Sequence, residues 1–240
     1  MQMDTEKRKR VIAVIPCLNE ERFIPHIVSL ATKYVDEVIV VDDGSEDDTA
    51  AAAEKAGAVV FKQPHRMGAG AGTTTGIQKA LEYGADIIVT LDGDGQHDPN
   101  EIPGLIQPII DGRCDVVIGS RFLRPAAVAR YRKFGIDVIT WSYNLGCREK
   151  VADAQSGFRA YSRKAAESLH ITYPGFGFSI QTLVQARKQG FRIAEQPVSC
   201  IYHDAGSTLN PIVHGLNVLW SVIKIRLQEE IFNRSRTGQT

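Results

Sequence analysis

Five short apolar runs, separated by polar loops and helical patterns, constrain the fold of this chain more than any other feature. They are rich in valine and isoleucine, and they cover residues 11–16, 37–41, 59–61, 87–91 and 115–119. Short, almost wholly apolar runs of this kind, of which residues 11–16 are continuous, are typical of strands buried on both faces of a parallel sheet. Helical patterns lie between them, at residues 20–33 with Asn19 as N-cap, at 47–56, up to about Tyr83, and after Pro99. The alternation predicts an α/β fold with a mostly parallel sheet flanked by helices.

The second half of the chain has a less regular pattern. We expect helices near residues 131–147 and 178–189, a turn and strand at 155–161, and a strand at 191–198. A length of 240 residues with 43% apolar side chains can fill one large core, and there is no linker or low-complexity segment. We therefore expect a single domain over residues 1–240. It would comprise a ligand-binding half at 11–120, a second binding half at 121–210, and a C-terminal amphipathic helix at 211–233.

Composition excludes several classes of protein. Lysine and arginine together number 28, equal to aspartate and glutamate, so no basic field favours nucleic acid. The four cysteines lack Cys-x-x-Cys spacing, which argues against a zinc knuckle or redox pair and favours a reducing cytoplasm. The basic run at residues 7–10 leads directly into a strand and not into a signal-peptide core. No apolar stretch of about 20 residues occurs, so we expect no membrane-spanning segment.

Polar residues follow four of the five predicted strands. In open parallel sheets, ligands bind beyond the carboxyl ends of the strands, so these residues are expected to converge on one site. They are Asn19 and Glu20, Asp42 and Asp43, Asp92 and Asp94, and Ser120 with Arg121.

The loop Asp92-Gly93-Asp94-Gly95-Gln96 is the predicted metal site. Hard oxygen donors suit Mg²⁺ or Mn²⁺, and Asp92, Asp94 and Gln96 would leave other coordination positions for a diphosphate and water. An Asp-x-Asp pair alone is more typical of a polar turn without a ligand, and it is the convergence of the other strand ends that favours the metal site here. His97 and Asp98 are expected to cap the following helix.

Two further loops are candidates for nucleotide binding. Asp42 and Asp43 can accept hydrogen bonds from ribose hydroxyls or a base N–H, the alternative being a solvated turn. The small residues around Gly68 let backbone amides approach a ligand closely. Their spacing does not match the dinucleotide fingerprint, and no Gly-Lys-Ser/Thr occurs, which argues against dinucleotide oxidoreductases and P-loop hydrolases.

Five motifs occur in order along the chain, at residues 16–20, 41–45, 92–96, 119–121 and 155–159. As an ordered set they resemble the inverting family-2 glycosyltransferases of GT-A-type fold, and within them the dolichyl-phosphate mannosyltransferase or polyprenyl-phosphate glycosyltransferase branch. The resemblance covers roughly residues 11–210. It implies a nucleotide-sugar donor, a divalent metal at Asp92, Asp94 and Gln96, and nucleotide contacts from Pro16, Leu18, Glu20, Asp42 and Asp43.

The resemblance also assigns an acceptor phosphate to Arg121 and to an arginine of residues 130–132, here Arg132, with Ser156 nearby. An arginine fork matches phosphate oxygens, and a phosphate is already ionised at neutral pH, so it needs no strong base. A sugar hydroxyl would need a carboxylate to take its proton, and Asp153 is the candidate. The alternative role of Asp153 is a bond to the backbone of the following turn. Asp94, Arg121 and Asp153 are thus the predicted catalytic residues.

The C-terminal segment departs from that branch, in which many members carry membrane-spanning helices. The predicted helix at 211–233 has one broad apolar face, which favours core or a homodimer contact. The alternative is a membrane-surface anchor, with Lys224, Arg226 and the N-terminal basic run on anionic lipid. His203 lies where the family often has a loop that closes over the donor.

These observations predict a metal-dependent inverting transfer of a hexose from a nucleoside-diphosphate sugar, with uridine or guanosine as base, to a polyprenyl phosphate. The expected location is cytoplasmic, peripheral to the inner face of the membrane. One alternative is a sugar-phosphate nucleotidyltransferase, although the Gly-rich basic loop of such enzymes is missing after the first strand. Another is a catalytically silent nucleotide-sugar binding module.

Overall fold

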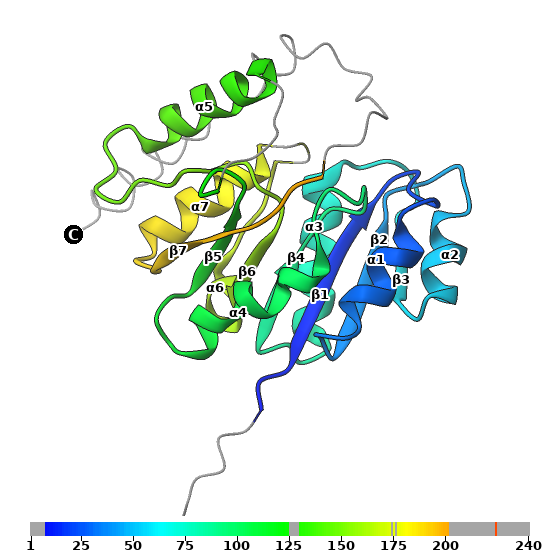
Figure 1. The fold of residues 1–240 in the computed structure, drawn as a ribbon. Coiled ribbons are helices and arrows are strands. Elements are labelled where there is room, and N and C mark those ends of the chain that lie inside the picture. Colours follow the sequence, from blue (N-terminus) through cyan, green and yellow to red (C-terminus); the bar gives the residue numbers. More distant parts are fainter. Residues whose placement is uncertain (1–7, 125–129, 174, 176, 202–223, 225–240) are drawn as a thin grey trace, which may run out of the picture.

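A seven-stranded sheet runs through the middle of the part of the chain that the structure describes (Figure 1). The structure is a computed structural model, and it describes residues 8–124, 130–173, 175, 177–201 and 224. The strand order is β3-β2-β1-β4-β6-β5-β7. The strands are β1 (Val11–Cys17), β2 (Glu37–Asp42), β3 (Val59–Lys62), β4 (Ile87–Thr90), β5 (Val116–Ser120), β6 (Arg159–Ser162) and β7 (Ile193–Pro197).

One strand of the sheet runs against the others. β1 pairs in parallel with β2 and β4, β2 with β3, and β5 with β7. β6 lies between β4 and β5 and is antiparallel to both. Its first residue, Arg159, pairs with Thr90 at the end of β4 and with Ile118 near the end of β5. The loop before β6 therefore lies at the same edge as the polar residues that follow β4 and β5.

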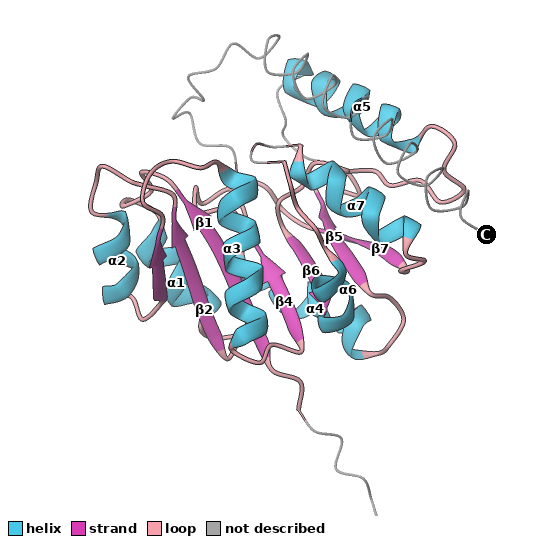
Figure 2. Ribbon diagram, turned by 180° about the vertical axis from the view of Figure 1, so that it is seen from behind, coloured by secondary structure: helices cyan, strands magenta, loops and turns pink. Residues whose placement is uncertain are grey.

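Helices cover both faces of the sheet, as Figures 1 and 2 show from opposite sides. Successive strand residues alternate between two cores: Ala13 and Ile15 belong to one, Ile12 and Val14 to the other. All four are fully buried, which explains why the run is apolar at every position. The first core includes residues of α1 (Ile24–Ala31), α2 (Thr49–Lys55) and α4 (Ile102–Ile110), which follows the short 3₁₀ helix Pro99–Glu101. The second includes residues of α3 (Ala69–Glu82), α5 (Arg130–Asn144), α6 (Arg163–Ser168) and α7 (Phe178–Lys188).

The predicted α/β fold, with its mostly parallel sheet flanked by helices, is confirmed. The prediction of Asn19 as an N-cap is wrong, because α1 starts at Ile24 with Phe23 in the cap position. Asn19 instead has a left-handed backbone with φ of 57°, and its side-chain oxygen accepts a hydrogen bond from the Glu46 amide at 2.8 Å. It thus holds two loops together. Helix α6 was not predicted, because its six residues are too few to show a helical period.

Some predictions fall outside the described residues, namely the C-terminal helix at 211–233, the loop with His203 and the side chain of Arg132. Within the described ranges, none of the helices is both long enough and apolar enough to cross a membrane. The division into a donor half at 11–120 and an acceptor half at 121–210 stays a prediction.

Candidate active site

The acidic loop after β4 forms the centre of the site. Asp92 and Asp94 are both half-buried. Gln96 donates from its backbone amide and its side-chain amide to the two oxygens of Asp94, at 3.0 and 2.6 Å. His97 is buried, lies against the Phe158 ring at 5.3 Å, and brings Nε2 to 3.4 Å from Asp92 Oδ2. Both carboxylates are therefore oriented by their own loop. Only Asp98 acts as the predicted cap, because it accepts from the Asn100 amide.

The loop before β6 approaches Asp92 closely. A Cβ added at Gly157 would lie 2.5 Å from Asp92 Oδ2 and 2.7 Å from Oδ1, so any larger residue at this position would displace the Asp92 carboxylate. The Thr90 hydroxyl donates to the Gly157 carbonyl at 2.9 Å and fixes the approach. On the other side, a Cβ at Gly93 would lie 2.5 Å from Cys17 Sγ. The acidic loop is thus packed between two distant parts of the chain.

The carboxylates of this region repel one another. Burial and the negative charge of Asp92 raise the pKa of Asp94. Burial, together with the charges of Asp94, Asp47 and Asp92, raises the pKa of Glu20 to about 7. Burial alone would raise the pKa of Asp92, but the His97 hydrogen bond and the charges of His97, Arg121 and Arg159 outweigh it and lower this pKa. Part of this acidic cluster therefore lacks compensating positive charge.

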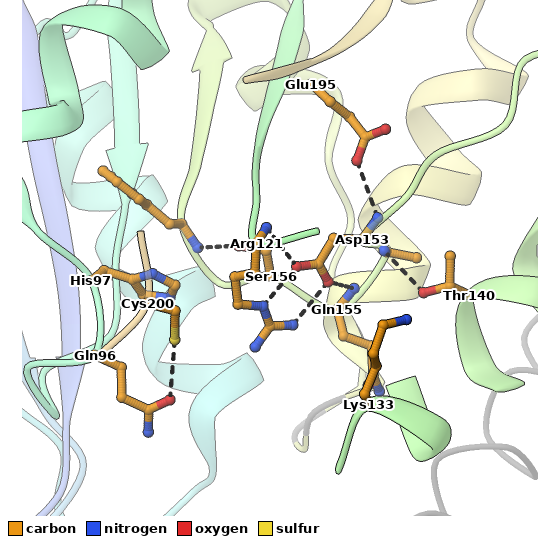
Figure 3. A network of polar contacts seen from close by, with 12 residues as sticks. Gln96, His97, Arg121, Lys133, Thr140, Asp153, Gln155, Ser156, Glu195 and Cys200 are labelled. Carbon is orange, nitrogen blue, oxygen red and sulfur yellow. Dashed lines mark hydrogen bonds and ion pairs between the residues drawn. The ribbon is translucent and has the colours of Figure 1, made fainter. Parts of the chain in front are cut away.

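These properties fit a divalent cation with hard oxygen ligands. A cation beside Asp92 and Asp94 would relieve the repulsion that raises the pKa of Asp94. Among the described residues, no three His, Cys, Asp or Glu side chains are arranged to hold a metal ion by themselves. The protein would therefore supply two carboxylates and leave other coordination positions to a ligand and water. Gln96 donates to Asp94 and accepts from Cys200 Sγ at 3.9 Å (Figure 3), so its role as a ligand stays a prediction.

The loops after β2 and β3 meet beside a cavity. Asp42 lines this cavity of about 370 Å³ and accepts from the Ser45 amide at 2.9 Å. Asp43 accepts from the Met67 and Gly68 amides at 2.7 and 2.8 Å, one on each oxygen. Gly68 has φ of 100°, which favours glycine. Asp43 therefore positions the Gly68 loop. Asp42, a predicted nucleotide contact, lines the cavity.

The loop after β1 is fixed to the loop after β2. Pro16 and Leu18 are half-buried, and Pro16 pairs with Val41 in the sheet. The Glu20 amide donates to the Thr49 hydroxyl at 2.7 Å. The structure thus brings the predicted nucleotide contacts of the first two strands to one edge.

A buried ion pair joins the loop after β5 to the loop at Asp153. Arg121 Nε and Nη2 lie 2.6 and 2.8 Å from the two Asp153 oxygens, and the Arg121 amide donates to Oδ2 at 3.2 Å. Asp153 is fully buried. Burial alone would raise its pKa, but the bonds and charge of Arg121 lower it. Figure 3 shows that Glu195 and Thr140 extend this network through the amides of residues 152–154.

Comparison with known proteins identifies the family. The family model described as glycosyl transferase family 2 matches residues 12–169. The chain belongs to this family.

Two curated relatives of this family-2 glycosyltransferase match nearly the whole chain. A UDP-N-acetylglucosamine–dolichyl-phosphate N-acetylglucosaminyltransferase of Methanococcus voltae is 32% identical and covers 88% of this chain and 91% of its own. An undecaprenyl-phosphate mannosyltransferase of Micrococcus luteus is 28% identical, with coverages of 91% and 99%. Membership in the family identifies the chain as a glycosyltransferase, which rules against the nucleotidyltransferase and silent-module alternatives.

Solved structures agree with the GT-A-type fold. Glucosyl-3-phosphoglycerate synthase from Mycobacterium tuberculosis, crystallised with Mn²⁺, UDP and glucosyl-3-phosphoglycerate, has a TM-score of 0.71 and 25% identity. The match covers 92% of this chain and 79% of that one. Another crystal of the same synthase contains Mg²⁺ and UDP. The predicted Mg²⁺ or Mn²⁺ cofactor agrees with these neighbours.

The glycosyltransferase site contains residues to which sequence reasoning gave no role at the site. Arg159 is 1% exposed and donates to the Ser179 and Ala154 carbonyls and to the Thr182 hydroxyl, at 2.7 to 2.8 Å. The sequence feature that could have indicated Arg159 is its position at the start of a strand-like run, within the motif at residues 155–159. Ser156, a predicted phosphate contact, is fully buried, and its hydroxyl accepts from the Phe158 amide at 3.3 Å.

Proposed function

We propose that this glycosyltransferase transfers a hexose from a nucleoside-diphosphate sugar to a polyprenyl phosphate, with inversion at the anomeric carbon and a bound Mg²⁺ or Mn²⁺. The two curated relatives support the acceptor, since both are named for transfer to a lipid phosphate. The structural neighbours support the donor and the metal, since they contain UDP with Mn²⁺ or Mg²⁺. We place the reaction at the cytoplasmic surface of a membrane, where such an acceptor is embedded.

The observation that carries the proposal is the burial of Asp153 and its ion pair with Arg121. A hydroxyl acceptor would need this carboxylate as a base, but Asp153 is fully buried and both its oxygens are bonded to Arg121. Its pKa is low, so it has little tendency to take a proton. A phosphate acceptor needs no base, because its oxygen is already ionised at neutral pH. The geometry therefore favours Asp153 as a positioning residue for Arg121.

In the proposed reaction, separate groups of residues bind the nucleoside, the metal ion and the acceptor phosphate. The cavity at Asp42 would hold the nucleoside, and the Gly68 loop, positioned by Asp43, would pass near the diphosphate. Asp92 and Asp94 would hold the metal ion, which supplies Lewis-acid stabilisation of the leaving diphosphate when bound. Arg121, together with Arg132 and with Ser156 nearby, would bind the acceptor phosphate so that one oxygen faces the anomeric carbon. A single in-line displacement then gives inversion.

A transfer assay tests this proposal. The purified chain is incubated with Mn²⁺, a panel of UDP- and GDP-hexoses, and a short-chain polyprenyl phosphate, and nucleoside diphosphate and glycolipid are measured. We expect both products with the phosphate, and none with the matched polyprenol, which differs only in lacking the phosphate. Transfer to the polyprenol, or to 3-phosphoglycerate in place of the lipid phosphate, would overturn the acceptor assignment. Arg121→Ala should lower the rate on the lipid phosphate while donor binding stays unchanged.

A further inference from the structure

Helix α5 has a second apolar face that the described residues leave uncovered. Its inner face carries Ile139 and Tyr143, which are buried in the second core. Its opposite face carries Phe134 and Trp141, and Leu145 follows directly after the end of the helix; the three side chains are 71%, 64% and 45% exposed. Phe134 and Trp141 are the two most exposed of the large apolar side chains in the described part of the chain.

The spacing of these residues makes one continuous stripe. Phe134, Val138, Trp141 and Leu145 are separated by four, three and four positions, which places them on one side of an α-helix. Val138 is half-buried. Leu123, which is 47% exposed, lies on the connection between β5 and α5. We call Phe134, Val138, Trp141 and Leu145 the outer stripe; the first three lie on α5, and Leu145 continues its last turn through a bond from its amide to the Trp141 carbonyl at 3.1 Å.

The charges around the outer stripe are mainly basic. Exposed Lys133 lies at its start and exposed Arg148 and Lys150 follow its end, while exposed Arg124 lies on the connection from β5. The acidic residues here are Asp137, which bonds to Lys133 at 2.7 Å, and Glu149. An aromatic and aliphatic stripe between basic residues is the pattern of helices that lie in the headgroup region of anionic membranes.

The outer stripe also lies close to the candidate acceptor site. The inner side of α5 contacts the Asp153 loop, because Thr140 accepts from the Ala154 amide at 3.3 Å and Asn144 bonds to Val151. Arg121 begins the connection that leads into α5. Figures 1 and 2 both show α5 at the outer edge of the molecule, on the side of the carboxyl ends of β5 and β7. A surface that touched the outer stripe would therefore lie beside the ion pair of Arg121 and Asp153.

We propose that the outer stripe of α5 docks the enzyme on an anionic lipid bilayer, with Phe134, Trp141 and Leu145 among the lipid headgroups and acyl chains. This inference rests on the proposed function, since docking here brings Arg121 to the level at which the phosphate of an embedded polyprenyl phosphate lies. The basic residues attract the anionic surface, and the stripe supplies the apolar contact.

Vesicle binding tests the proposal without turnover. The full chain with Trp220→Phe keeps Trp141 as its single tryptophan. Its fluorescence is followed on titration with vesicles of phosphatidylcholine mixed with phosphatidylglycerol. We expect a blue shift and quenching by brominated lipid, both weaker with pure phosphatidylcholine and at high salt. Changing Phe134, Trp141 and Leu145 together to Gln should weaken sedimentation with anionic vesicles about tenfold or more. Ile110→Gln, an exposed apolar residue at the end of α4, is the matched control and should leave it unchanged.

Other outcomes would overturn the inference. A Trp141 emission that is already blue-shifted without lipid and moves red on removal of residues 202–240 would show that the chain covers its own stripe. A shift that depends on protein concentration would show a second copy. Unchanged vesicle binding of the triple variant would show that another surface docks. Activity on a water-soluble short-chain polyprenyl phosphate separates this inference from the proposed function, because that activity needs no bilayer and should survive in the triple variant.

Discussion

The donor and acceptor sides of the site differ in how their buried carboxylates are compensated. On the donor side, Asp94 and Glu20 have raised pKa values, because they are partly buried close to other carboxylates. On the acceptor side, Asp153 is more deeply buried, yet its pKa is low because Arg121 neutralises it. The donor side is thus left with excess negative charge that a cation can neutralise, whereas the buried carboxylate on the acceptor side already has an arginine as its partner. The predictions below test this difference, from the largest expected effect to the smallest.

Removing Asp153 should cost the most stability. Asp153→Ala removes the carboxylate that binds the partly buried Arg121 guanidinium through two hydrogen bonds, and we expect a loss of about 3 to 5 kcal/mol in the free energy of unfolding. Urea denaturation followed by circular dichroism measures this. The exposed pair of Lys133 and Asp137 is the control, and Asp137→Ala should cost less than about 1 kcal/mol. Equal losses in the two variants would contradict a structural role for the buried pair.

Removing Asp94 should cost activity and not stability. Asp94→Ala deletes a proposed metal ligand, and we expect a loss in kcat of about 10² to 10³-fold. The fold should persist, because the variant also removes repulsion with Asp92. Mn²⁺ should raise the melting temperature of the wild type and not that of the variant. Asp98→Ala, in the same loop, should retain the activity. Full activity in Asp94→Ala would contradict the metal assignment.

Gly157→Ala should disturb the donor side through contact alone. The new methyl group would overlap the Asp92 carboxylate, which must rotate away because it is the freer of the two groups. We expect an activity loss of about 10²-fold from the misplaced ligand, together with weaker Mn²⁺ binding measured by titration calorimetry. Gly104→Ala, where an added Cβ meets nothing within 4 Å, should behave as wild type. Unchanged Mn²⁺ affinity in Gly157→Ala would argue against a tight fit at Asp92.

Glu20→Gln should give a smaller effect that depends on pH. Folded Glu20 has a pKa of about 7 against an ordinary value of 4.5. As the pH rises between these values, the unfolded chain loses this proton before the folded chain does, so wild-type stability falls. At pH 8 the variant should therefore be more stable by about 1 kcal/mol, allowing for partial solvent screening. At pH 4 the two should match, as should the exposed Glu54→Gln control at both values. Equal differences at pH 4 and pH 8 would contradict the raised pKa.

The sequence was most informative where a pattern is local. The apolar runs predicted β1 to β5 because strands in the middle of the sheet are buried on both faces and have few positions for a polar residue, and the carboxyl ends of these strands located the acidic loop. Contacts between distant residues left no such pattern. The fit of Gly157 against Asp92 and the pairing of Arg121 with Asp153 depend on how β6 enters the sheet. The conformation of Asn19 depends on Glu46, so its residue type alone suggested a cap.

The position of β6 has a consequence for how this enzyme can be divided. Among the described strands, β6 lies between β4 and β5 and pairs with both. A fragment ending at residue 121 would lack β6, so the edges of β4 and β5 that face it would be unpaired. Unpaired edges in the middle of a sheet promote association with other chains. We therefore expect that the donor half cannot be truncated from the chain or exchanged with that of a relative as a separate module. We also expect that it does not fold by itself during synthesis. The contact of Gly157 with Asp92 in the acidic loop can form only after β6, which ends at Ser162, has been synthesised.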